Sequence, residues 1–448
     1  MDMYKINKKA LYAIPLIAAV TLSACQKFLD VEPRASISDK QTIFDASSAE
    51  TALNGVYGSF YYGTSFESIG YLSGDNIQWT GSHSSIQEFI NHHVSAENEN
   101  ISGAWDAIYS TVNRANNVIS KVPQVTDPSL SDSLKNQITG EAYFIRALAY
   151  FDLARTWGGV PLITEPTTSP ADNIGIPRSS QQETYAQVLK DLNTAEPLLP
   201  ETTDRYRATR KTVWALKARY YLYQKDWKNA EAYADKLIND SANYRLIKPY
   251  GSFFQNNVQA NQEAVFYIFH SSSEPNGERG SWQPQQNGGT RQWAPNDAFV
   301  ALVNNPAIGG NRNVLVAQDN QGRWYGNLYY RSDGSDPNYI IRIAELYLIR
   351  AEARAQQNNL SGALQDLDAV RDRAGLEKST ASTQADILLA IENECRIEFA
   401  LEPHRWYDLV RTGRAGTVLG IKDADYFLMP IPADQLLADK ALEQNHGY

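Results

Sequence analysis

Aromatic side chains that lie next to amide, carboxyl and arginine side chains are the residues of this 448-residue chain whose chemistry is easiest to assign. A sugar ring stacks one face of C–H groups on a flat aromatic ring, while its hydroxyl groups form hydrogen bonds with polar side chains around the edge. This combination occurs around residue 79 and again between residues 282 and 325. We therefore predict an oligo- or polysaccharide site made of Asp75, Asn76, Trp79, Trp282, Arg291, Trp293, Arg323, Trp324 and Tyr325.

Burial in the core is the competing interpretation for each of these rings, because tryptophan is usually largely buried. The composition of the surrounding segments favours exposure. Residues 271–338 are rich in Asn, Gln, Gly, Ser and Pro and have no helical periodicity. An insertion of this length is usually functional or disordered, and disordered segments are usually poor in aromatic residues. The tryptophans of this stretch therefore indicate a functional insertion.

The sequence motifs of the common enzyme classes are absent. There is no Gly-x-Ser-x-Gly, no glycine-rich phosphate loop and no His-Glu-x-x-His. A group of glutamates could include the acid and base of a glycoside hydrolase, but their spacing beside arginines favours an ion-pair network on a helix. These residues are Glu392, Glu394, Glu398 and Glu402, with Arg396 and Arg405. We predict no enzyme activity, and a helical glycoside hydrolase is the less favoured alternative.

We expect neither a cofactor nor a metal site. His92 and His93 are adjacent, so a regular helix or strand cannot present both on one face as ligands. The run from Asp333 to Asp336 could contribute to a calcium site, but it lacks the rest of a ligand loop and is better interpreted as a turn. Cys395 has no neighbour in the sequence that would lower its pKa, so we do not expect a nucleophile there.

Residues 1–24 are typical of a secretory signal, because three lysines precede an apolar run that is too short to span a bilayer. Cys25 directly follows Leu22-Ser23-Ala24, a pattern typical of bacterial lipoproteins, which are acylated on this cysteine. We predict that Cys25 carries a lipid anchor; ordinary export to the periplasm is the alternative. Cys395 then remains alone, which excludes an internal disulfide. No later apolar run is long enough for a transmembrane helix.

The formal net charge of the chain is −10, so phosphate contacts would not drive binding to nucleic acid. Only three methionines are present, which argues against a plastic hydrophobic groove. We expect no nucleic-acid partner.

Apolar residues that recur every three or four positions predict helices over residues 101–121 and 134–156. The clearest internal signal is a repeat with an offset of 133 residues. It has the spacing of a helix-turn-helix tetratricopeptide unit, in which small residues allow two helices to approach closely. The aligned residues are Trp214, Ala218, Ala230, Ala234 and Leu237 in one copy, and Tyr347, Ala351, Ala363, Leu367 and Val370 in the other. Residues 142–157 with 183–198 predict a third, looser unit.

We predict a mainly α fold of about four tetratricopeptide-like helix pairs, with a loop-rich lobe of minor β content. The mature chain, 25–448, would be a single domain. Its helical scaffold would span residues 41–239 and 339–448, and its ligand lobe about 240–338. Short strands are expected at residues 253–254 and 265–269.

Motifs spread over almost the whole mature chain resemble the SusD/RagB family, the surface lipoproteins that capture nutrients for TonB-dependent outer-membrane transporters in Bacteroidota. In the first half they are Cys25-Gln26-Lys27-Phe28-Leu29-Asp30, Glu141-Ala142-Tyr143-Phe144-Ile145-Arg146-Ala147 and Trp157-Gly158-Gly159-Val160-Pro161. In the second half they are Ile341-Arg342-Ile343-Ala344-Glu345, Val370-Arg371-Asp372-Arg373-Ala374-Gly375-Leu376, Arg405-Trp406-Tyr407-Asp408-Leu409 and Met429-Pro430-Ile431-Pro432. Three positions depart from the family pattern: Cys395 stands for a usual arginine, Pro403 for a glycine and His446 for a proline.

The resemblance implies a non-catalytic binder of oligo- or polysaccharide that works with a SusC-like TonB-dependent transporter at the outer membrane. Some relatives serve peptide importers, so a peptide ligand is the alternative. The shared motifs mark the scaffold rather than the ligand site, which varies among members. Relatives commonly build part of their glycan platform from the connection that holds Trp79. A single site would require the fold to place residues 71–93 against the 271–338 lobe.

Overall fold

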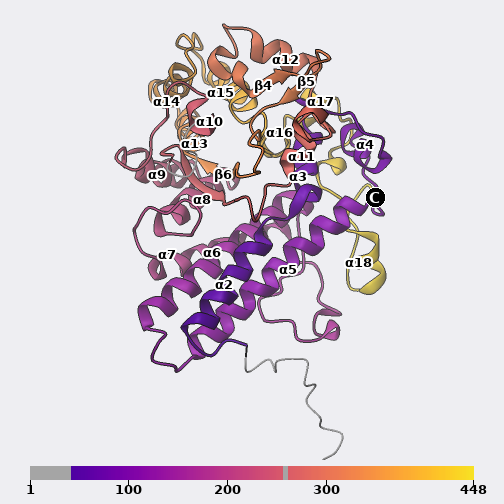
Figure 1. The fold of residues 1–448 in the computed structure, drawn as a ribbon, viewed down its shortest axis with the longest axis vertical. Coiled ribbons are helices and arrows are strands. Elements are labelled where there is room, and N and C mark those ends of the chain that lie inside the picture. The colour runs from indigo at the N-terminus through magenta and orange to yellow at the C-terminus, as the bar shows by residue number, and fades with distance from the viewer. Residues whose placement is uncertain (1–41, 256–260) are drawn as a thin grey trace, which may run out of the picture.

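Helices make up most of the computed structural model, which describes residues 42–255 and 261–448 (Figure 1). Helix accounts for 56% of the structure and strand for 5%, so the predicted mainly α class is confirmed. The predicted signal segment and Cys25 lie outside the described residues. The helices of the first half are α2 (Ala46–Phe60), α3 (Gly63–Leu72), α4 (Ser84–Asn91), α5 (Glu99–Lys121), α6 (Asp132–Trp157), α7 (Gln181–Leu198), α8 (Arg210–Tyr223) and α9 (Trp227–Ile238).

Two long helices, α5 and α6, pack together with α2 in the lower half of Figure 1 and begin at capping residues. The side chains of Asn98 and Ser131 accept hydrogen bonds from N–H groups in the first turns, which the helices themselves leave without partners. After α6, Gly158 has a φ of 79°, a conformation that glycine adopts without strain. The predicted helices at 101–121 and 134–156 are confirmed. Among the described residues, none of the helices is both long and apolar enough to cross a membrane.

The same helix pair occurs twice, 133 residues apart. Arg210 begins α8 and Ile343 begins α13 (Ile343–Gln356), while Trp227 begins α9 and Leu360 begins α14 (Leu360–Arg373). Helix α9 packs against α13 and joins the two pairs, and α6 packs against α7 as the predicted third pair. The small side chains of the alignment have no exposed surface: Ala218, Ala230, Ala234, Ala351 and Ala363. The predicted repeat is therefore confirmed.

Replacing Ala218 with tryptophan should overpack the contact between α8 and α9 and lower the free energy of unfolding by roughly 1–3 kcal/mol or more. Urea denaturation followed by circular dichroism measures this change. Ala232→Trp is the matched control, because Ala232 is exposed on α9. If both variants unfold at the urea concentration of the parent protein, Ala218 does not lie at a tight helix crossing.

Short elements fill the chain between the helix pairs. They are α10 (Ser252–Gln255), β2 (Ala264–Ile268), α11 (Glu278–Trp282), β3 (Trp293–Pro295), α12 (Asp297–Asn304), β4 (Val316–Gln318), β5 (Trp324–Gly326) and β6 (Asn338–Arg342). The strands, with β1 (Ile77–Trp79), form antiparallel pairs β1–β3, β2–β6 and β4–β5. The strand predicted at 265–269 is confirmed as β2. The strand predicted at 253–254 is wrong, because both phenylalanines are buried in one helical turn. Two adjacent apolar residues carry no periodicity that could distinguish a strand from a helix.

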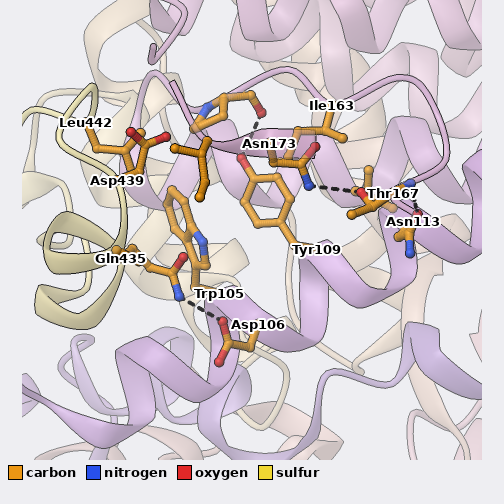
Figure 2. Close-up of a pocket in the computed structure, with 14 residues that line it drawn as sticks. Trp105, Asp106, Tyr109, Asn113, Ile163, Thr167, Asn173, Gln435, Asp439 and Leu442 are labelled. Carbon is orange, nitrogen blue, oxygen red and sulfur yellow. Dashed lines mark hydrogen bonds between the residues drawn. The ribbon is translucent and has the colours of Figure 1, made fainter. Parts of the chain in front are cut away.

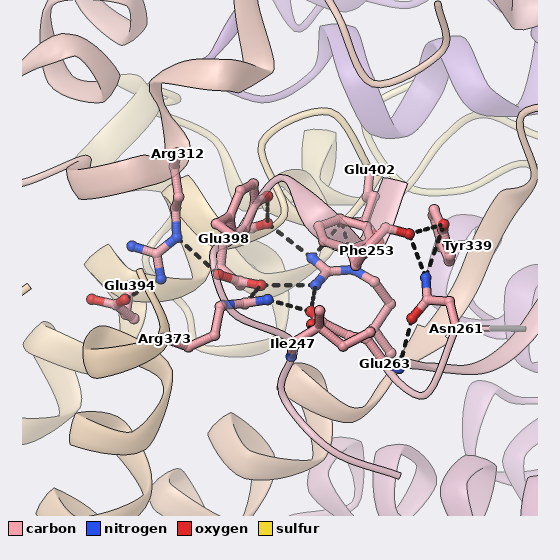
Figure 3. A network of polar contacts seen from close by, with 12 residues as sticks. Ile247, Phe253, Asn261, Glu263, Arg312, Tyr339, Arg373, Glu394, Glu398 and Glu402 are labelled. Atoms are coloured by element: carbon pink, nitrogen blue, oxygen red, sulfur yellow. Dashed lines mark hydrogen bonds and ion pairs between the residues drawn. The ribbon is translucent and has the colours of Figure 1, made fainter. Parts of the chain in front are cut away.

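A buried network of three arginines and four glutamates connects this lobe to α14, to α15 (Gln384–Glu398) and to the turn after α15 (Figure 3). The remaining helices of the C-terminal part are α16 (Arg405–Arg411), α17 (Ala415–Leu419) and α18 (Ala433–Ala438). Arg342 at the end of β6 is 1% exposed and pairs with Glu263, Glu398 and Glu402 at 2.6–2.8 Å. Arg373 also pairs with Glu263 and Glu398, and Arg312 pairs with Glu394 and Glu398.

The network confirms that the C-terminal glutamates form ion pairs. Burial alone would raise the pKa of Glu398, but the charges of Arg373, Arg312 and Arg342 outweigh burial and hold it below its usual range. The sequence predicts that the arginine partners lie beside these glutamates on the same helix. This part of the prediction is corrected, because most of these arginines come from other elements of the fold. Each carboxylate is already bound by an arginine, which does not suit a general acid and base for glycoside hydrolysis.

Candidate functional site

Strand pairing brings together the two segments that hold the predicted sugar-binding residues. Strand β1 pairs with β3, with Trp79 opposite Trp293. Strand β3 lies against β5, which begins at Trp324. Residues 71–93 therefore lie against the 271–338 lobe, as a single site requires.

Arg291 connects the two sides of this junction. Its Nε donates a hydrogen bond to the carbonyl oxygen of Trp324 at 2.7 Å, and its own carbonyl oxygen accepts one from the hydroxyl of Thr80. Arg323 is held by Asp319 at 2.8 Å and leaves 49% of its side chain exposed. Burial and the nearby charge of Arg323 lower the pKa of Arg291. Two guanidinium groups are therefore close together beside Trp324.

Trp79 and Trp324 are the partly exposed rings of the junction. The Trp79 ring lies over Gly81 so closely that a Cβ atom there would be 2.3 Å from it, which only glycine permits. Exposed polar residues lie close to the two rings along the chain: Thr80, Ser82 and His83 follow Trp79, and Asn320 and Gln321 precede Trp324. We call Trp79, Trp324, Arg291 and Arg323 the aromatic platform. Partly exposed rings with fixed polar groups beside them suit a ligand that has both C–H faces and hydroxyl groups.

The prediction that Trp282, Trp293 and Tyr325 face a ligand is corrected by their burial. Their exposed fractions are 0%, 2% and 8%. The rings of Trp282 and Trp293 pack on Tyr71 of α3 with centroid distances of 5.1 Å, and 5.5 Å from each other. This aromatic cluster forms the core beneath the platform, so these rings offer no free face to a sugar in this structure.

Asp75 and Asn76 also have a structural position rather than the predicted place beside a ligand. The Asp75 carboxylate forms ion pairs with Arg396 at 3.1 Å and Arg405 at 2.8 Å. Asn76 is 1% exposed; its amide donates to the carbonyl oxygen of Arg396 and accepts from the Arg396 guanidinium. Both residues attach the start of β1 to the C-terminal helices.

A buried carboxyl group lies behind the aromatic cluster. Glu278 of α11 accepts a hydrogen bond from the Tyr71 hydroxyl at 2.8 Å and another from the Asn338 amide. Burial raises the pKa of Glu278 to about 7, even though its hydrogen bonds act in the opposite direction. Burial and the negative charge of Glu278 also raise the pKa of nearby Glu67. Burial therefore favours the neutral forms of both glutamates.

Replacing Glu278 with glutamine should flatten the pH dependence of stability. The unfolded chain loses this proton in the ordinary glutamate range, whereas the folded protein keeps it up to about pH 7. The proton on Glu278 therefore stabilises the folded protein at low pH. This stabilisation is lost as the pH rises from the ordinary glutamate range to about 7. Between pH 4.5 and 8, the melting temperature of the variant should increase relative to that of the parent protein as the pH rises. Glu274→Gln, at an exposed position, is the control; parallel curves for Glu278→Gln and the parent would contradict the assignment.

A cleft of about 290 Å³, which the sequence did not reveal, lies between α5, the chain after α6 and the C-terminal segment around α18 (Figure 2). Trp105 and Tyr109 of α5 form part of its wall, and the Tyr109 hydroxyl donates to the carbonyl oxygen of Pro161. Helical periodicity placed both rings on one apolar face. Part of that face packs in the core and part lines the cleft. Periodicity alone cannot show which residues do which.

The remaining chemical candidates have structural partners. Asp336 pairs with Arg331 at 2.6 Å, and Asp333 accepts hydrogen bonds from Ser335, so this run forms the predicted turn. The described residues contain no group of three or more His, Cys, Asp or Glu that could hold a metal ion. Burial raises the pKa of the Cys395 thiol well above its usual value, which keeps the thiol protonated and unreactive.

Two family comparisons cover most of the chain. Residues 27–222 match a family described as "Starch-binding associating with outer membrane", and residues 217–425 match the SusD family. This family is one of non-catalytic glycan-binding proteins.

Individual relatives match over most of their lengths. The chain is 28% identical to SusD-like protein P38 of Formosa agariphila over all of both chains, and 25% identical to a SusD-like protein of Bacteroides ovatus over 91% of this chain and 83% of that one. A solved structure described as "Laminarin binding SusD-like protein" matches 90% of this chain and 100% of its own, with a TM-score of 0.80 and 25% identity. "Surface glycan-binding protein A from Bacteroides fluxus" has a similar fold, with a TM-score of 0.76, 21% identity, and coverage of 90% of this chain and 99% of its own. From these matches and the fold, the chain belongs to the SusD/RagB family.

Proposed function

We propose that this protein captures an oligo- or polysaccharide on the aromatic platform and delivers it to a SusC-like TonB-dependent transporter. The observation that carries the proposal is the junction of β1, β3 and β5, which places Trp79 and Trp324 beside Arg291. The rings would stack on the C–H faces of sugar residues, and the guanidinium groups would donate to their hydroxyl groups. The backbone bonds of Arg291 would keep these groups in place before the ligand arrives.

Relatives that bind glycans support this proposal, among them the laminarin-binding protein and the surface glycan-binding protein. A hydrolase is the less favoured alternative, because arginines already bind the carboxylates that could have served as acid and base. A peptide ligand is the alternative within the family. The platform favours sugar, because flat rings flanked by hydrogen-bond donors suit a polyhydroxylated ligand.

Affinity electrophoresis separates the three possibilities. The mature protein would be run in native gels that contain starch, laminarin, levan or xylan, and in parallel each glycan would be assayed for new reducing ends after incubation with the protein. We expect retardation by at least one glycan and no new reducing ends. A hydrolase would release reducing ends. A peptide-binding protein would run at its free mobility in every gel and would bind a peptide mixture instead.

The lipid anchor and the transporter are the second part of the proposal. Acylation of Cys25 would hold the protein at the outer membrane, in agreement with the outer-membrane association in the family description. The protein would cover the transporter as a lid, and a glycan would favour the closed state only as far as it binds that state better. Mild detergent extraction should co-purify a TonB-dependent barrel with this protein. A monomer free of any barrel would contradict the lid, and a Cys25→Ala protein that stays with membranes in cells without the transporter would contradict the anchor.

A further inference from the structure

A groove separate from the aromatic platform lies between α2, the segment before α8 and the end of β2. Its volume is about 620 Å³, within the usual range for small-molecule sites. We call it the Tyr206 groove; the lining residues that matter here are Asn54, Tyr57, Tyr206, Arg207, Phe269 and His270. None of them belongs to the platform.

Two exposed aromatic rings lie together on this groove. Tyr206 is 46% exposed and Phe269 is 41% exposed, and their ring centroids are 5.4 Å apart with an interplanar angle of 47°. Among the described residues, the large apolar side chains that are clearly exposed include one other aromatic residue, Phe44. A pair of exposed rings gives a ligand two adjacent faces for stacking.

Polar groups are fixed beside the rings. The Nε of Arg207 donates to Glu141 at 2.7 Å, its Nη1 donates to Asn54 at 2.8 Å, and its guanidinium lies over the Tyr57 ring at 4.5 Å. Within the described residues, the Nη2 of Arg207, the side-chain nitrogen of Asn54 and the Tyr206 hydroxyl donate no hydrogen bond. Donors whose side chains are already held in place lose little freedom when a ligand binds.

The charges of the groove suit a neutral ligand. Glu141 neutralises Arg207, and burial lowers the pKa of His270, which keeps its imidazole neutral. Glu274 is an exposed charge at the edge of the groove. A strongly basic or acidic peptide would find little to pair with there.

We infer that the Tyr206 groove is a second binding site for a neutral oligosaccharide segment, stacked on Tyr206 and Phe269 and held by Asn54 and Arg207. The inference rests on the proposed function, because both sites would bind the same polymer. A chain long enough to reach both would bind more tightly than either site alone allows, since the second contact is made at a high effective concentration. A short oligosaccharide would gain nothing from the second site once the platform has bound it.

Affinity electrophoresis with three variants tests the inference, with the panel polysaccharide that retards the parent protein most as the probe. The variants are Tyr206→Ala/Phe269→Ala, Trp79→Ala/Trp324→Ala, and all four changes together. The groove variant should bind the polysaccharide roughly ten-fold more weakly while it melts like the parent, because both rings are exposed. The platform variant should keep residual binding that the combined variant loses. Phe44→Ala is the control for loss of an exposed ring, and Tyr206→Phe/Phe269→Tyr should restore the binding.

Three results would overturn the inference. A groove variant that binds the polysaccharide as the parent does shows that the groove takes no sugar. The same conclusion follows if that variant keeps its glycan binding but no longer co-purifies with the barrel, because the groove is then a protein-docking surface. A parent protein that binds none of the four polysaccharides contradicts the proposed function itself, and the inference with it.

Discussion

Replacing Arg342 with leucine is expected to lower the free energy of unfolding by about 3–5 kcal/mol, the usual cost of leaving a buried charge without its partner. The Arg342 guanidinium contacts three glutamates in a site that excludes water. The change would leave Glu402 without the only ion-pair partner that the described residues give it. Glu263 would lose one of its two arginine partners and keep Arg373. Glu398 would lose one of three and keep Arg312 and Arg373.

Urea denaturation at pH 7 measures this effect. Lys248→Ala is the matched control, because it removes a cation from an ion pair with Asp372 that lies on the surface. Exposed pairs contribute little to stability, so the control should unfold close to the parent protein. If Arg342→Leu and Lys248→Ala unfold alike, the buried network does not hold the lobe to the C-terminal helices.

The double variant Trp79→Ala/Trp324→Ala is expected to weaken glycan binding by roughly ten- to a hundred-fold. The loss of one stacked ring corresponds to about 1–1.5 kcal/mol, or roughly a ten-fold change in affinity. The two rings lie on β1 and β5, which both lie against β3, and would contact one ligand, so their effects need not add fully. Titration calorimetry with the oligosaccharide that binds the parent protein would measure the change.

The control for this variant removes a tryptophan of similar burial from the scaffold. Trp227 at the start of α9 is also partly buried, and Trp227→Ala should leave the affinity unchanged. Melting temperatures distinguish lost contacts from lost structure. If the platform variant binds as the parent does, or loses binding only because it unfolds, Trp79 and Trp324 are packing residues.

The scaffold could be predicted from the sequence because its signals are local. The spacing of Ala218 and Ala230 reflects the close approach of two helices that follow each other in the chain. The same spacing recurs at Ala351 and Ala363, which strengthens the prediction of a helix pair. The antiparallel pairing of β1 with β3 is different, because it joins residues more than two hundred positions apart. The sequence could show only that a shared site needs these two segments to meet.

The individual residues of the site were harder to predict, because burial depends on partners that are distant in the sequence. Trp282 and Trp293 lie in polar segments, yet Tyr71 and Glu278 meet them in the core. Asp75 looks like a ligand-binding carboxylate beside Trp79, but the fold brings Arg405 to it. Of the predicted residues, Trp79, Trp324, Arg291 and Arg323 keep positions from which they can meet a ligand.

A crystal structure of the protein soaked with the oligosaccharide that retards it most strongly tests the central claim most directly. The proposed site predicts sugar rings in van der Waals contact with Trp79 and Trp324, with hydroxyl groups within hydrogen-bond distance of Arg291 or Arg323. A sugar that contacts neither tryptophan, for example one bound only in the cleft beside Trp105, would contradict it.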